Sequence, residues 1–196
     1  MLSIALKSNI VLRAIETAVA KIRAVTAGIT EDKTAFTLLY LRRFFSTAEI
    51  KRITECKVYA PMLELDWIED IDIQYRERPI PNFYKLLSES VKVDVPLQDG
   101  DSVTLEKGIE ICALLTRGHS HGSMSFILGD NIIFTGDAIP VAHDLPIFVD
   151  YEQSLYSLDR INELSNVQYF CPAWDEIYDK IRLKEKVYQI NKIAAQ

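Results

Sequence analysis

Histidine, cysteine and glycine are all scarce in this chain of 196 residues. The only histidines are His119, His121 and His143, so any site that uses imidazole must draw on these three. The three cysteines are widely spaced and form no C-x-x-C pair. This pattern argues against a disulfide framework and predicts a reducing compartment. Apart from Gly28, no glycine precedes position 100, so tight-turn chemistry is concentrated in the second half of the chain.

Long apolar runs are also missing, because no stretch approaches the roughly 20 residues that a membrane span needs. The first 25 residues lack a compact apolar stretch followed by a small-residue cleavage site, so they are a poor secretion signal. We expect a cytoplasmic protein. Residues 1–60 carry ten basic and five acidic side chains, and the rest of the chain is strongly acidic. We interpret the basic part as helix surface, which predicts neither a nucleic-acid nor a membrane partner.

The length suits a single domain over residues 1–196, and 48% hydrophobic residues exclude a disordered chain. The pattern of the residues before position 56 predicts helices. Apolar residues recur at helical intervals between Ile10 and Val25, and the segment 31–45 favours a helix over a strand. Ser46 and Glu49 have the spacing of a capping box at the start of a further helix.

From residue 56 onwards the pattern predicts mainly strands. Two apolar strands joined at residues 129–131 predict a hairpin over 123–139. Residues 61–90 are punctuated by prolines and predict irregular structure with a short helical patch. The remaining expectations are strands at 56–60, 91–97, 101–115 and 167–174, and helices at 151–165 and 175–196. The fold class is therefore α/β (α+β).

One stretch, TRGHSHGSMSFILGDNIIFTGDAIP at residues 116–140, carries the features of a reactive site. Glycines flank the histidines of GHSHGS, which allows a tight turn that exposes imidazole at a strand end. Asp137 follows the second hairpin strand, so its carboxylate and His119 can emerge at the same sheet edge. Such a pair would suit a Zn, Mn or Fe ion. Glycine-rich turns with a capping aspartate explain the same residues without any metal.

The same stretch resembles the second half of the metallo-β-lactamase superfamily, where a T-P-G-H-x-x-G-S turn precedes a hairpin ending in F-T-G-D. The resemblance covers roughly residues 48–180, whereas residues 1–47 diverge and are expected to be helical. It implies an αββα sandwich with metals at one edge, and hydrolysis by a metal-bound hydroxide. It also makes His119 a metal-binding histidine and Asp137 the carboxylate that usually bridges two metals.

The resemblance has gaps at the family's other ligand positions. The segment TLLYLRRFFSTAEI stands where the family has H-x-H-x-D-H, and Trp174 stands at or beside a later ligand histidine. Substitutes for the missing ligands would have to come from His121, His143 or Asp175. The simpler interpretations are an exposed turn for His121 and a solvent-facing loop for His143, and a helix N-cap explains Asp175 equally well.

Three hypotheses follow from the sequence. The first is a hydrolase with a degenerate site holding one Zn (or Mn/Fe) ion, whose bound water attacks an ester, lactone or thioester-like small molecule. The second is a non-catalytic binding or subunit protein of the same fold without metal. The third is a remodelled or truncated family member, in which residues 1–47 are not the family's N-terminal half. The sequence leaves a homodimer open.

Overall fold

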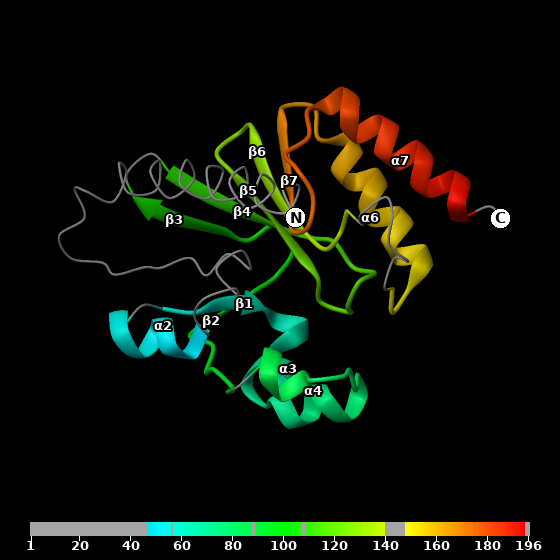
Figure 1. Cartoon of the computed structure of the whole chain (residues 1–196). Coiled ribbons are helices and arrows are strands. Elements are labelled where there is room, and N and C mark those ends of the chain that lie inside the picture. The colour runs from blue at the N-terminus through cyan, green and yellow to red at the C-terminus, as the bar shows by residue number, and fades with distance from the viewer. Residues whose placement is uncertain (1–46, 56, 88, 107–108, 140–147, 195–196) are drawn as a thin grey trace, which may run out of the picture.

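The computed structural model describes residues 47–55, 57–87, 89–106, 109–139 and 148–194 (Figure 1). The helices expected within residues 10–45 lie outside this part of the chain, as do Ser46 and His143. Within the described residues, no helix is long and apolar enough to cross a membrane.

The central element of this part of the chain is a five-stranded sheet in the order β3-β4-β5-β6-β7. Its first four strands pair antiparallel, and β7 pairs parallel with β6. The strands are β3 (Ser102–Glu106), β4 (Ile109–Leu115), β5 (Met124–Leu128), β6 (Ile132–Gly136) and β7 (Tyr169–Pro172).

The predicted hairpin is confirmed as β5 and β6. Ile127 pairs with Ile133 and Leu128 with Ile132 across the tight turn. Gly129 takes a φ of +55°, a left-handed conformation that glycine adopts without steric cost. Its position in the turn therefore fixes the register, and with it the strand end from which Asp137 emerges.

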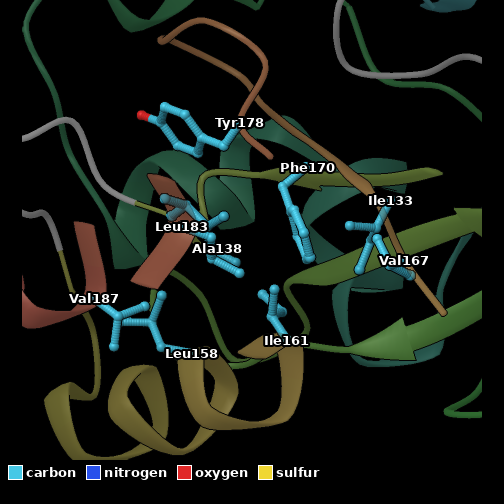
Figure 2. Close-up of a cluster of buried hydrophobic side chains, with 10 residues drawn as sticks. Ile133, Ala138, Leu158, Ile161, Val167, Phe170, Tyr178, Leu183 and Val187 are labelled. Carbon is cyan, nitrogen blue, oxygen red and sulfur yellow. The ribbon is translucent and has the colours of Figure 1, made fainter. Parts of the chain in front are cut away.

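Two helices cover one face of the sheet, α6 (Tyr151–Glu163) and α7 (Lys180–Ala194) (Figure 1). Helix α6 begins where the Asp150 carboxylate accepts a hydrogen bond from the Gln153 amide at 3.0 Å, an ordinary N-cap. Figure 2 shows how side chains from both helices meet those of β6 and β7. This core contains Ile133, Ala138, Ile139, Leu158, Ile161, Val167, Phe170, Tyr178, Leu183 and Val187.

The opposite face of the sheet contacts a smaller parallel pair, β1 (Tyr59–Pro61) and β2 (Val95–Leu97). Leu97 packs with Ala113 and Met124 of the large sheet, so two sheets lie face to face behind the helices. The other elements that precede β3 in the described chain are α2 (Thr47–Thr54), η2 (Met62–Glu64), α3 (Leu65–Glu69), α4 (Ile71–Glu77) and α5 (Phe83–Leu86). This layer order of helices, sheet and second sheet agrees with the predicted sandwich.

Two sequence predictions are corrected in detail. Residues 61–90 are more helical than the prolines indicated, because three short helices fit between Pro61 and Pro79 and a fourth follows Pro81. The last helix begins at Lys180 instead of residue 175. Before it, the chain folds back beside β7, and Tyr178 and Phe170 exchange two backbone hydrogen bonds of 2.9 Å. That pairing takes up backbone groups that a longer helix would need.

Candidate functional site

Three strands bring the candidate residues to one edge of the large sheet. Strands β4 and β6 both run antiparallel to β5, and β7 runs parallel to β6, so their C-terminal ends lie at the same edge. The turn at residues 118–123 follows β4, Asp137 follows β6 and Trp174 follows β7. The edge therefore collects side chains from segments more than 50 positions apart in the sequence.

His119 and Asp137 meet at this edge, as the hairpin predicted. The imidazole Nε2 lies 4.0 Å from the carboxylate Oδ2, at the outer limit of an ion pair. The two side chains are 26% and 27% exposed, so solvent and small ligands reach both of them. The pair thus has the accessibility of a binding site, although its separation is wider than a direct hydrogen bond.

Trp174 forms a hydrogen bond with the other oxygen of the Asp137 carboxylate. Its indole Nε1 donates a hydrogen bond of 2.6 Å to Asp137 Oδ1, while the residue is 65% exposed. The backbone explains this contact, because the Ala173 amide donates to the Gly136 carbonyl at 2.9 Å and continues the β6–β7 pairing past the last strand residue. Asp137 therefore lies between an indole donor and an imidazole.

The start of the histidine turn (residues 118–123) is held in place by contacts with α6 and the residues just before it. The amides of Val149 and Asp150 donate to the Gly118 carbonyl at 2.7 and 3.1 Å. The Ser157 hydroxyl donates to the Arg117 carbonyl at 2.7 Å. A glycine is required at position 118, since its φ is +134° and an added Cβ would lie 1.9 Å from Ser154 Oγ. The turn and α6 are consequently one packed unit.

We expect Gly118→Ala to lower the free energy of unfolding by about 3 kcal/mol or more, because a strained backbone adds to overpacking. Gly129→Ala is the matched control. Its φ is also positive, but nothing lies within 4 Å of an added Cβ. That variant should lose only about 1–2 kcal/mol of unfolding free energy, the cost of a left-handed backbone conformation for alanine. Urea unfolding of both variants measures the difference, and equal losses would contradict the close packing of Gly118 on Ser154.

The structure shows neither His121 nor Asp175 as a ligand that joins His119 and Asp137. His121 is exposed and lines a separate cavity of about 140 Å³ with Leu63, Glu64, Asp66, Trp67 and Glu77. His143 lies outside the described residues. Asp175 does not cap a helix as one alternative had it, because α7 begins only at Lys180.

Asp175 is instead part of a structural network under α7. Its Oδ2 accepts hydrogen bonds from the Tyr178 hydroxyl and, at 3.0 Å, from the Lys186 ammonium. Burial acts to raise the pKa of this carboxyl, but hydrogen bonds from Tyr178, Lys186 and the Glu176 amide, with the charge of Lys186, hold the pKa below its usual value. Burial and the same carboxylate raise the pKa of Tyr178. Asp175 is therefore bound to α7.

These contacts test whether a metal fits the site. A catalytic zinc normally takes three protein ligands, and His119 and Asp137 supply two. Among the residues that the structure describes, no group of three or more His, Cys, Asp or Glu could hold a metal ion. The bond from Trp174 also engages one of the two oxygens of Asp137. The described residues do not fit the dinuclear site that the resemblance implied.

Comparisons with known proteins identify the fold. No protein-family model matches the chain, and no curated protein matches its sequence. Solved structures do match. An archaeal metallo-β-lactamase superfamily protein, ST1585 from Sulfolobus tokodaii, is similar with a TM-score of 0.59 and 19% identity, over 73% of this chain and 61% of that one. A metallo-β-lactamase family protein from Thermus thermophilus, TTHA1429, has a TM-score of 0.59 and 16% identity, over 76% and 56%.

A third structure, ETHE1 from Myxococcus xanthus, has a TM-score of 0.53 and 17% identity, over 88% of this chain and 68% of that one. The chain therefore has the metallo-β-lactamase fold, as the sequence motifs predicted. It spans 61% and 56% of the length of the first two structures.

Sequence reasoning missed two residues that contact the histidine turn, Glu64 and Arg78. The Gly122 amide donates to Glu64 Oε1 at 2.5 Å, and Arg78 Nη1 donates to the His119 carbonyl at 3.2 Å. These partners are separated by 58 and 41 positions in the sequence. No local signal marks them, because their role depends entirely on where η2 and α4 lie in the fold.

Proposed function

We propose that this chain is a metallo-β-lactamase superfamily member that binds a small molecule at the His119–Asp137 edge without hydrolysing it. The observation that carries the proposal is the hydrogen bond from Trp174 Nε1 to Asp137 Oδ1. In the family that the sequence resembles, this carboxylate serves metal ions and a histidine stands at or beside the position of Trp174. An indole N–H is a donor only and cannot ligate a cation.

The electrostatics of the edge support the same conclusion. The Asp137 carboxylate accepts from the indole through one oxygen and faces the His119 imidazole through the other. A partly exposed carboxylate keeps contact with solvent, and the hydrogen bond from the indole stabilises it further. Asp175, a carboxylate near the end of β7, already faces Lys186.

The exposed groups indicate how such a ligand would be bound. Trp174 is largely exposed, and the partly exposed His119 imidazole offers a hydrogen-bonding group on the other side of the same carboxylate. A small molecule with a planar or apolar part and a polar group matches this pair.

A hydrolase with one metal ion is the second candidate, and the approach of His119 to Asp137 favours it. The Nε2 and Oδ2 atoms, 4.0 Å apart and partly exposed, could both contact a single Zn, Mn or Fe ion. His143 would then be the candidate third ligand. Such an ion would supply a hydroxide that attacks an ester, lactone or thioester-like carbonyl. The role of His119 and Asp137 would be to hold the ion, and that of Trp174 to orient the carboxylate.

Metal content separates the two candidates. We expect protein purified without chelator to contain no Zn, Mn or Fe above the level in His119→Ala and Asp137→Ala, measured by elemental analysis. Chelator should leave the midpoint of thermal unfolding unchanged, and generic esters and lactones should not turn over. About one metal per chain, lost in both variants together with ester or lactone turnover, would establish the hydrolase instead.

A further inference from the structure

The histidine turn is fixed from two sides, and the second side has no part in the function proposed above. Helix α6 contacts the beginning of the turn through the Gly118 carbonyl. The opposite contact comes from the segment of η2, α3 and α4, which reaches the turn through Glu64 and Arg78. Both partners on the turn are backbone groups, the His119 carbonyl and the Gly122 amide.

The contact at Gly122 is close and charged. The carboxylate of Glu64 accepts from the Gly122 amide at 2.5 Å, which is short for a hydrogen bond from a backbone amide. A Cβ added to Gly122 would lie 2.5 Å from Glu64 Cγ and 3.0 Å from Leu63 Cβ. Any side chain at position 122 would therefore push Glu64 away from the turn.

The contact at His119 fixes the residue that carries the imidazole. Arg78 Nη1 donates to the His119 carbonyl at 3.2 Å from the C-terminal end of α4. Its guanidinium is always charged and orients the peptide plane that follows the His119 Cα. Together with the Gly122 contact, it fixes the turn at two points three residues apart.

We propose that Glu64 and Arg78 are positioning residues that set the direction of the His119 imidazole towards Asp137. Hydrogen bonds inside the turn transmit the constraint, because Ser120 bonds to Ser123 through both its amide and its hydroxyl, at 3.0 and 2.7 Å. A turn fixed at both ends and bonded internally leaves His119 little backbone freedom. The inference is independent of whether an ion or a small molecule binds at the edge.

The test is nuclear magnetic resonance at one fixed pH, on metal-free protein labelled with ¹⁵N and ¹³C. In Glu64→Ala and Arg78→Ala we expect the imidazole signals of His119 and the indole N–H signal of Trp174 to move. In Glu64→Ala the exchange of the Gly122 amide with solvent should accelerate about tenfold or more, because its acceptor is gone. Glu64→Gln keeps an acceptor and should stay close to the wild type.

Asp72→Ala is the matched control. Asp72 lies on α4 like the residues next to Arg78, but it accepts from the Tyr84 hydroxyl at 2.8 Å and has no hydrogen bond to the turn among the described residues. Its removal should leave the signals of His119 and Gly122 in place. Unchanged signals in folded Glu64→Ala and Arg78→Ala, or equal shifts in Asp72→Ala, would overturn the proposal. If an alanine variant fails to fold, Glu64→Asp and Arg78→Lys decide instead, and signals of His119 unmoved in both would also overturn it. Neither result bears on the metal content, so the two proposals fail separately.

Discussion

Replacing Trp174 by histidine is expected to strengthen metal binding at the His119–Asp137 edge. The substitution removes the indole donor from Asp137 Oδ1 and places an imidazole beside the carboxylate. His119 and Asp137 would then have a third protein ligand next to them, the number that a catalytic zinc normally takes. We expect Co²⁺ to bind at least about tenfold more tightly than to the wild type, measured by titration of its visible absorption.

Trp174→Phe is the control for this substitution. Phenylalanine keeps an aromatic ring at position 174 and removes the hydrogen bond to Asp137, but it adds no ligand. Its affinity for Co²⁺ should therefore remain close to that of the wild type. Equal binding by wild type and Trp174→His would show that the indole does not decide the metal chemistry of this edge. Tight binding by Trp174→Phe would show instead that the hydrogen bond alone keeps the ion out.

Replacing Phe170 by alanine is expected to lower the free energy of unfolding by about 3–5 kcal/mol. Its side chain is fully buried in β7 between α6, α7 and the sheet (Figure 2), and the ammonium of Lys180 lies 5.2 Å from its ring centroid. Removing the ring leaves a cavity that rigid neighbours cannot fill. Since whole domains are stable by only about 5–15 kcal/mol, we expect a clearly lower urea midpoint.

The neighbouring Tyr169 provides the comparison within the same strand. It lies next to Phe170 in β7, but the residue is 47% exposed. Tyr169→Ala should therefore cost less than about 1 kcal/mol in the same urea experiment. Similar losses for both variants would mean that strand pairing, and not the packing of the ring, provides the stability at this position.

The sequence motifs predicted one part of the candidate site and not another. The residues of the hairpin and of GHSHGS placed His119 and Asp137 at one sheet edge, because alternation and turn residues fix which strand ends meet. The short motif could not indicate that Trp174 donates to Asp137. That bond depends on the parallel pairing of β7 with β6, between segments 37 positions apart in the sequence.

The sequence by itself determined the class of fold, the hairpin, helix α6 and the pair of residues at the sheet edge. These features follow from local periodicity, turn residues and two successive motifs, all of which act over a few positions. Only the tertiary structure decided what surrounds that pair. Trp174 engages Asp137, Asp175 is bound by Tyr178 and Lys186, and Glu64 and Arg78 reach the histidine turn. Each of these contacts except that of Asp175 joins distant segments, and all of them depend on how sheet and helices pack.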